Sequence, residues 1–398
     1  MNITMLEKGQ DKKMNADSKI LSGLNLVPGP TLVPEKIREI YSRQWPSPDL
    51  DPDFAQTYKR AASALGQLLG LKPNSCLTPE DPGQVVIMSG EGMVALWAAV
   101  KSMIRPGDRV LAIDNGIFGR GIGEMAASCG AEVEFLSADY SQAPDLPRLS
   151  ELVESFQPTM VTAVHCETPT GLLNPLGEIA VALRANGWKG IFCVDAVASI
   201  GATPVKVEEW EIDICLGGSQ KVLSCPPDTS FLYVSQRAWK AAQRCGYQGY
   251  DALLPFHKAA LTGYFPYTHN WAGVEALATA AETILAQGIE HSYERHAECS
   301  RITVEIALEL GLDLYPEEAL SSPTVTALRV PEDADWDTLN RILIQRGVHF
   351  GGSYGHLAGK VFRIGHMGSQ ADVRLVKKAM DELGEALLDL SDCAGEEP

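Results

Sequence analysis

The sequence lacks an apolar run long enough to cross a bilayer, so we expect no membrane-spanning segment among its 398 residues. Residues 1–19 mix acidic side chains with lysines, whereas a secretory signal requires an apolar stretch and a transit peptide avoids acids. The final Gly395-Glu396-Glu397-Pro398 matches no retention or peroxisomal signal. A cytoplasmic protein is therefore expected.

Positive charge is also scarce. Lysine and arginine together number 33 against 51 aspartates and glutamates, which gives a formal net charge of −18. A surface this acidic repels the phosphates of nucleic acids and of anionic lipids. We therefore expect no nucleic acid and no membrane as a partner, while a few cations in a cleft would still suffice to bind a small anionic substrate.

Paired cysteines are absent as well. The nine cysteines are scattered along the chain, and none forms a Cys-x-x-Cys pair. Disulfide frameworks and structural zinc sites both need paired or closely spaced cysteines. The pattern predicts reduced thiols in a reducing compartment and no metal site.

Short apolar, β-branched runs alternate with helix-periodic segments through much of the chain. The predicted strands are Val85–Met88, Arg109–Ile113, Val133–Leu136, Met160–His165, Ile191–Asp195, Ile214–Leu216 and Phe231–Ser235. The predicted helices include Gly92–Met103, Gly121–Cys129, Asp145–Phe156 and Pro175–Asn186, and a long helical stretch runs from Trp271 to about Gly311. This alternation predicts an α/β fold with a mostly parallel sheet buried between helix layers.

The C-terminal part of the chain has a different pattern. Strands are predicted at Thr324–Val330, Val348–Gly352 and Val361–His366, and helices at Trp336–Arg346 and Ala371–Leu388. This mixture over a short length indicates a small α+β domain. We therefore divide the chain into a disordered tail at 1–20, a large domain at 21–290 and a small C-terminal domain at 291–398.

Polar or glycine-rich segments follow the predicted strands. They are Ser89-Gly90-Glu91-Gly92-Met93, Asn115-Gly116-Ile117-Phe118-Gly119, His165-Cys166-Glu167-Thr168-Pro169-Thr170-Gly171, Asp195-Ala196-Val197 and Gly217-Gly218-Ser219-Gln220-Lys221. Taken singly, such a glycine makes a turn, an aspartate caps a helix and a lysine is a solvated charge. Ligands of open parallel sheets, however, bind beyond the carboxyl ends of the strands. The recurrence of these segments there indicates one binding cleft.

Several of these motifs together resemble the class V, fold-type I aminotransferases, in particular the alanine–glyoxylate and serine–pyruvate group. The most specific stretches are residues 167–175, 194–199 and 218–221. The resemblance extends from Pro28-Gly29-Pro30-Thr31 to Arg363-Ile364-Gly365-His366-Met367-Gly368. It implies a large cofactor-binding domain with a mostly parallel seven-stranded sheet between helices, a small C-terminal α+β domain and a pyridoxal 5′-phosphate cofactor.

The resemblance also implies roles for the residues at the strand ends. Lys221 would hold the cofactor as a Schiff base and then move a proton between the substrate Cα and the cofactor C4′, because an amine both condenses with an aldehyde and accepts a proton. Asp195 would pair with the pyridine nitrogen and keep the ring an electron sink. Phe118 would stack on that ring. The other expected cofactor contacts are Glu91, Gly92, Met93, Thr168, Val197, Gln220 and Thr268.

Two residues are expected at the substrate. Arg363 resembles the family arginine that binds the α-carboxylate through two parallel hydrogen bonds, and Gly29 would bring backbone close to the same carboxylate. Thr268 resembles a segment that reaches into the phosphate site of the neighbouring subunit, which implies a homodimer with active sites at the interface. The implied reaction transfers an amino group from a small donor of the alanine or serine type to a 2-oxo acid such as pyruvate or glyoxylate.

Glu91 departs from the family pattern, which has a small hydroxyl residue in this loop. A carboxylate beside a phosphate dianion is repulsive. Pyridoxamine–pyruvate aminotransferase, a relative whose substrate is unphosphorylated pyridoxamine, carries a glutamate here; the chain resembles it at Thr168-Pro169 but differs from it at Phe118 and Tyr354. Free pyridoxamine as the donor is therefore the alternative, unless Glu91 faces solvent or caps the following helix.

Two other interpretations fit the residues less well. A cysteine desulfurase requires a histidine immediately before the lysine, where Gln220 stands, and a reactive loop cysteine. A catalytically inactive binding paralogue predicts the loss of Lys221 or Asp195, and both are present.

Overall fold

The computed structural model describes residues 23–78, 83–185 and 187–394 of the chain. The disordered tail expected at residues 1–20 lies outside the described residues.

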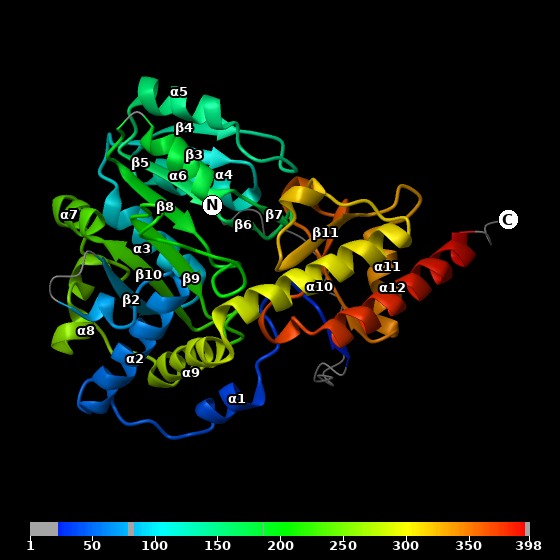
Figure 1. The fold of residues 1–398 in the computed structure, drawn as a ribbon, viewed down its shortest axis with the longest axis horizontal. Helices are drawn as coiled ribbons and strands as arrows, with labels where there is room; N and C mark the ends of the chain where they lie inside the picture. The colour runs from blue at the N-terminus through cyan, green and yellow to red at the C-terminus, as the bar shows by residue number, and fades with distance from the viewer. Residues whose placement is uncertain (1–22, 79–82, 186, 395–398) are drawn as a thin grey trace.

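A seven-stranded sheet forms the centre of the larger body (Figure 1). In spatial order its strands are β2 (Gly83–Ser89), β10 (Thr229–Ser235), β9 (Ile214–Gly218), β8 (Ile191–Asp195), β5 (Met160–Val164), β3 (Arg109–Asp114) and β4 (Glu132–Ser137). β10 is antiparallel to both of its neighbours, and the other pairs are parallel. The prediction of a mostly parallel seven-stranded sheet is confirmed, and each strand overlaps a predicted one.

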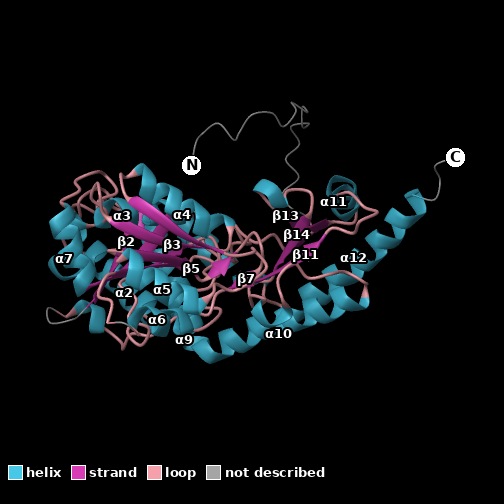
Figure 2. Ribbon diagram, turned by 90° about the horizontal axis from the view of Figure 1, so that it is seen from above, coloured by secondary structure: helices cyan, strands magenta, loops and turns pink. Residues whose placement is uncertain are grey.

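Helices cover both faces of this sheet (Figure 2). One layer contains α3 (Gly92–Met103), α4 (Ile117–Ser128) and α7 (Gln236–Cys245), and the other contains α2 (Asp53–Leu68), α5 (Leu146–Phe156), α6 (Leu176–Arg184) and α9 (Trp271–Gln287). Successive strand residues point into opposite cores: in β10, Phe231 packs on the α2 side and Leu232 on the α3 side. Burial on both faces explains why these strands are continuous apolar runs.

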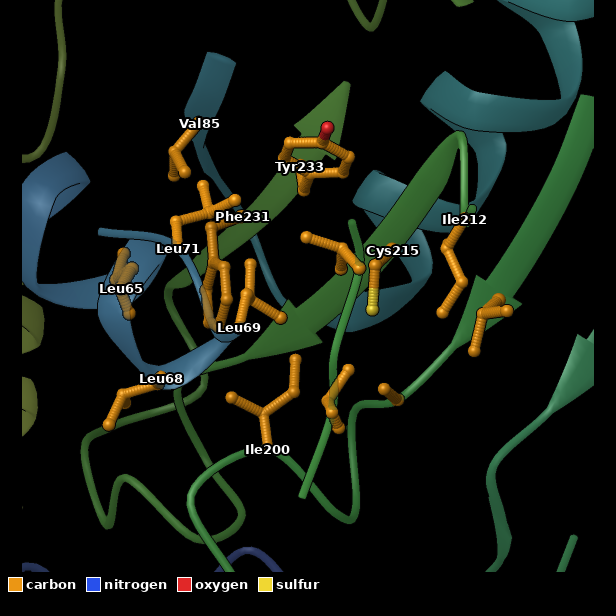
Figure 3. Packing of buried hydrophobic residues seen from close by; sticks show 14 of the residues in the cluster. Leu65, Leu68, Leu69, Leu71, Val85, Ile200, Ile212, Cys215, Phe231 and Tyr233 are labelled. Carbon is orange, nitrogen blue, oxygen red and sulfur yellow. The ribbon is translucent and has the colours of Figure 1, made fainter. Parts of the chain in front are cut away.

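The core on the α2 side contains side chains of β9 and β10. Leu69 and Leu71, just beyond the end of α2, pack with Phe231 of β10 and with Ile200 (Figure 3). Cys215 of β9 is buried in the same cluster. These contacts pack β9 and β10 against the helix layer. They therefore hold the end of β9, which Lys221 follows, in place.

A smaller body contains a three-stranded sheet in the order β11 (Val325–Arg329), β14 (Val361–Gly365) and β13 (Gly351–Gly352). Helices α10 (Ile289–Glu309), α11 (Trp336–Gln345) and α12 (Val373–Ala394) share a separate core with it. The short β1 (Leu24–Asn25) pairs with β12 (Val348–His349), so the first described residues pack with the C-terminal elements. The boundary at residue 290 stays a proposal, which the separation of the cores at α9 and α10 supports.

The expectation of one helical stretch from Trp271 to about Gly311 is wrong. The stretch breaks at Gly288, whose φ of +91° is readily adopted only by glycine. The break separates α9, which packs in the large core, from α10, which runs along the smaller body (Figure 1).

The remaining helices and strands are short. They are α1 (Glu35–Tyr41), α8 (Ala259–Thr262), β6 (Cys166–Glu167) and β7 (Leu172–Leu173). Within the described ranges, no helix has the length and hydropathy required to span a membrane. Over the same ranges, no cluster of three or more histidine, cysteine or carboxylate side chains is arranged to hold a metal ion.

Candidate active site

A cavity of about 190 Å³ lies at the edge of the large sheet where β2, β8 and β9 end. Of the residues predicted to contact a cofactor, its lining contains Glu91, Gly92, Met93, Phe118, Thr168, Asp195, Val197, Gln220 and Lys221. Leu96, Val164, Cys166 and Ala198 complete the lining. These last four were assigned no role from the sequence, because small and apolar residues carry no chemical signal of their own.

Lys221 follows β9, and its side chain lines the cavity. Its Nζ donates a hydrogen bond to the carbonyl oxygen of Pro28 at 2.5 Å. Burial, and then the positive charge of Arg363, lower the pKa of the Lys221 amine to about 8. The amine is therefore partly unprotonated near neutral pH and can act as a nucleophile.

Gly29 packs directly against this lysine. A Cβ at position 29 would lie 2.5 Å from the Cδ and 2.8 Å from the Nζ of Lys221. The sequence suggested Gly29 as a residue that lets backbone approach the substrate carboxylate; the structure places it against the lysine. Any larger residue at position 29 would push the amine out of its present position.

Asp195 is the last residue of β8 and is nearly buried. Its Oδ1 accepts a hydrogen bond from the N–H of Val197 at 2.9 Å. Burial raises the pKa of the Asp195 carboxyl to about 6, while this hydrogen bond and the charge of Lys221 lower it. A buried carboxylate at this position can pair with a protonated ring nitrogen.

Glu91 occupies the N-cap position of α3, but its side chain makes no capping hydrogen bond. Instead, its Oε2 accepts from the Nε2 of Gln220 at 3.2 Å, and both side chains line the cavity. The Oε1 of Gln220 is buried and lacks a partner in the described part of the chain. Glu91 is thus neither a helix cap nor turned away from the cavity, and this end of the cavity presents acceptor oxygens.

Phe118 lies in the first turn of α4, with its ring on the cavity. The helix predicted at Gly121–Cys129 begins earlier, at Ile117. Its N-cap, Gly116, has no side chain, and the carboxylate of Glu167 takes its place: Oε2 accepts from the N–H of Phe118 at 3.2 Å and Oε1 from that of Gly119 at 2.6 Å. Sequence reasoning assigned no role to Glu167, although a glycine at a helix cap is a signal that the cap comes from elsewhere.

Arg363 lies on β14 and is 3% exposed. Its Nε donates to the carbonyl oxygen of Gly352 at 2.9 Å, which also accepts from Nη2, and its Nη1 donates to that of Thr168 at 3.4 Å. The ring of Tyr354 covers the guanidinium, with its centroid 4.6 Å from Cζ. A guanidinium has five N–H groups; the two carbonyls accept from three of them, and the side chain of Tyr354 is a further hydrogen-bond partner.

Thr268 lies apart from the cavity of its own chain. Its hydroxyl donates to the Oδ2 of Asp49 at 2.6 Å, in an exposed hydrogen bond. Its expected contribution to the phosphate site of a neighbouring subunit stays a prediction.

Two histidines near the strand ends do not line the cavity. His165 Nδ1 pairs with the hydroxyl of Ser199 at 2.9 Å, and burial lowers the pKa of this imidazole to about 3. His366 Nε2 pairs with the hydroxyl of Thr326 at 2.8 Å, and burial lowers its pKa to about 4. Both imidazoles are neutral at physiological pH and support the packing around the site.

Cys166 does line the cavity, but its thiol is buried and hydrogen-bonded. The Sγ donates to the hydroxyl of Ser322 at 3.0 Å, and burial raises the pKa of the thiol. A thiol held protonated is a poor nucleophile, which leaves the Lys221 amine as the reactive group.

The residues around the cavity fit a pyridine aldehyde cofactor. The Lys221 amine can condense with an aldehyde, Asp195 can pair with a ring nitrogen, and Phe118 offers a face for stacking. Gly92 and Met93 begin α3, where helix geometry leaves amide donors without intrahelical partners for a phosphate. The fit is poorer at that end, because Glu91 and the unpartnered Oε1 of Gln220 lie there as well.

Comparisons with known proteins point the same way. Residues 75–368 match the family described as Aminotransferase class-V. The chain is 32% identical to alanine–glyoxylate aminotransferase of Oryctolagus cuniculus over 312 residues, 75% of this chain and 78% of the relative. It is 29% identical to pyridoxamine–pyruvate transaminase of Mesorhizobium japonicum over 346 residues, 85% of each. The structure of alanine–glyoxylate aminotransferase from Nostoc sp. superposes with a TM-score of 0.85 at 27% identity, covering 95% of this chain and 97% of that one.

The lowered pKa of Lys221 predicts a pH-dependent reactivity. In cofactor-free protein, modification of Lys221 by trinitrobenzenesulfonate, followed by peptide mass spectrometry, should quicken as the pH rises, with a midpoint near pH 8, where half of the amine is neutral. Replacing Arg363 by Gln removes a positive charge and should move the midpoint to higher pH. Arg329→Gln, the same change at an exposed position on β11, is the control and should leave it unchanged. A rate that does not depend on pH in this range would refute the assignment.

Proposed function

The chain belongs to the class-V aminotransferases, and we propose that it transfers an amino group from a small donor of the alanine or serine type to a 2-oxo acid such as pyruvate or glyoxylate. The observation that carries this proposal is the Lys221 amine of lowered pKa in one cavity with Asp195 and Phe118, next to a buried arginine. Enzymes of this family use pyridoxal phosphate, and the same residues are those that would hold it.

Pyridoxal phosphate, when bound, supplies a protonated pyridine ring that withdraws electrons from the substrate Cα. Asp195 would keep the ring nitrogen protonated, because a buried carboxylate favours a positive partner. The Val197 amide holds the carboxylate in place for this contact. Phe118 and Val197, which line the cavity, would offer the ring a stacking face and an apolar contact.

Lys221 would hold the cofactor through its aldehyde group. Its Nζ would also be the base for the reaction, able to take the proton from the substrate Cα and to give it up again. The lowered pKa of about 8 favours this role, since a fully charged ammonium cannot take a proton. The Pro28 carbonyl, which accepts from Nζ, offers the amine a resting partner.

Arg363 binds the α-carboxylate of both the donor and the acceptor. The backbone carbonyls accept from three of its five N–H groups, and the remaining Nη hydrogens would bind the carboxylate oxygens in place of the Tyr354 side chain. The Thr168 carbonyl, which accepts from Nη1, links this arginine to the cavity wall. Such a contact would orient the Cα–H bond of the substrate relative to the cofactor ring.

We further propose a homodimer in which Thr268 reaches the phosphate site of the neighbouring subunit. Its exposed position supports this, because the side chain is free to meet a second chain once the bond to Asp49 opens.

A cytoplasmic location is part of the same proposal. The nine cysteines contain no Cys-x-x-Cys pair, which favours a reducing compartment.

The function can be tested by chemical trapping. Borohydride reduction of the protein with pyridoxal phosphate should fix the cofactor mass on the peptide that contains Lys221, and Lys221→Ala should lose both the label and transamination. A panel of alanine, serine and aspartate as donors with pyruvate and glyoxylate as acceptors identifies the substrates by product formation. Labelling of a different lysine, or full activity in Lys221→Ala, would contradict the proposal.

Removal of Arg363 tests the carboxylate contact. Arg363→Ala should raise the KM for both amino and 2-oxo acids by roughly two orders of magnitude, because a charged hydrogen bond contributes about 2–3 kcal/mol. Arg329→Ala, which removes an exposed arginine from the neighbouring strand β11, serves as the control. Steady-state kinetics that show an unchanged KM in Arg363→Ala would exclude this role.

A second candidate function is favoured by the acceptor oxygens at the phosphate end. There, Glu91 accepts from Gln220, whose own Oε1 is buried without a partner among the described residues. A phosphate dianion has no proton to offer these oxygens, whereas the hydroxymethyl group of free pyridoxamine does. In this alternative, unphosphorylated pyridoxamine is the amino donor and pyridoxal is the product.

Glu91→Ser separates the two candidates. If Glu91 excludes phosphate, the substitution should tighten pyridoxal phosphate binding by about tenfold or more and raise the KM for pyridoxamine, as measured by absorbance titration and by pyridoxal formation with pyruvate. Glu124→Ser, at an exposed glutamate on α4, is the control. Wild-type protein that forms no pyridoxal from pyridoxamine and pyruvate would eliminate the second candidate.

A further inference from the structure

The carboxylate of Glu167 is buried where the large sheet meets the first turn of α4. Its residue is 0% exposed, and its two oxygens accept the N–H groups of Phe118 and Gly119. The backbone of Glu167 is also held, because its carbonyl accepts from the N–H groups of Thr170 at 3.2 Å and Gly171 at 2.9 Å. A rigid turn therefore presents this carboxylate to a helix that is distant in sequence.

The helix is shaped to receive this carboxylate. A Cβ at Gly116, the N-cap, would lie 2.0 Å from the Cδ of Glu167. An N-cap serine or aspartate, which would normally satisfy the first amides of a helix, cannot be accommodated beside it. Glycine at position 116 is therefore what allows the carboxylate of Glu167 to reach the first amides of α4.

We propose that Glu167 is a positioning residue that caps α4 from outside the helix and so sets the position of the Phe118 ring against the cofactor. The inference rests on the proposed function and extends it to a residue outside the cavity lining. Glu167 does not touch the reacting atoms. It acts through Phe118, whose backbone N–H it holds and whose ring lines the cavity.

The same turn connects Glu167 to the rest of the site. The next residue, Thr168, lines the cavity, and its carbonyl oxygen accepts from Arg363. A displacement of Glu167 would act directly on Phe118, whose N–H it holds, and would reach Arg363 only through Thr168. The carboxylate also lies at the positive end of the α4 dipole, where negative charge is favoured. Burial raises the pKa of Glu167, whereas the N–H groups of Gly119 and Phe118 lower it and so favour the charged form.

A double-mutant cycle on cofactor affinity tests the inference. Glu167→Gln keeps the shape of the side chain but turns an NH₂ group toward one of the helix amides, so it should weaken pyridoxal phosphate binding by about tenfold. In a Phe118→Ala background, the same substitution should cause little further loss, because the ring that Glu167 positions is gone. The dissociation constants come from titrations of apoprotein with pyridoxal phosphate, or with pyridoxamine if the wild type binds only that.

Gly116→Ala reaches the same contact from the helix side and guards against a folding defect specific to Glu167→Gln. It should weaken cofactor binding similarly, whereas Gly121→Ala, on the same helix with nothing within 4 Å of the added Cβ, should bind as the wild type does. Circular dichroism establishes that each variant is folded. The control for the charge change is Glu124→Gln on the exposed face of α4.

The outcomes distinguish this inference from the function beneath it. Wild-type protein that binds neither pyridoxal phosphate nor pyridoxamine overturns the proposed function, and the inference with it. Wild-type binding together with unchanged affinity in Glu167→Gln overturns the inference alone. So does a loss of affinity that is equally large in the Phe118→Ala background, because Glu167 would then support the fold without acting through the ring.

Discussion

The site depends on an amine that is kept out of water without being neutralised by an ion pair. Burial disfavours the charged form of Lys221, and Arg363 disfavours it further, while Asp195 and Glu91 act in the opposite direction. The balance of these effects leaves the pKa of the amine near neutral pH, as both nucleophilic attack and proton transfer require. The close approach of Gly29 and the hydrogen bond to the Pro28 carbonyl then fix where this amine lies.

Two helices begin near the cavity, and they use their N-termini differently. The first turn of α3 follows Glu91, whose side chain turns to Gln220 and leaves the helix amides uncapped. The first turn of α4 is closed by Glu167. The positive N-terminus of α3 is thus available to a ligand, whereas the N-terminus of α4 is capped by Glu167, which we propose positions the Phe118 ring. The same backbone geometry serves binding in one case and positioning in the other.

The acidic character of the protein extends into this cavity, at Glu91 and Asp195. Arg363 supplies the opposite charge beside it, buried under the Tyr354 ring. In the proposed function, a substrate carboxylate would meet a strong local partner here in spite of the net charge of −18, because a buried charge is screened far less than surface charges are. The acceptor oxygens of Glu91 and Gln220 lie by the start of α3, so a phosphate would be the part of the proposed cofactor that this site accommodates least well.

The sequence alone determined the strands of the large sheet and which residues stand at their ends. The run Ile191–Asp195 was predicted with the boundaries that β8 has, because apolar, β-branched residues encode a buried strand locally. The motifs around the lysine, the aspartate and the arginine are local as well, so the resemblance to a known family could point to these residues, whose roles stay predictions. Tertiary structure decided what depends on distant contacts. The first turn of α4 was missed because its cap comes from Glu167, 49 residues from Phe118, and the reversal of β10 leaves no trace in periodicity. The orientation of Glu91 and the contact of Gly29 with Lys221 likewise arise only when separate loops meet, since hydrogen bonding and close packing act through space rather than along the chain.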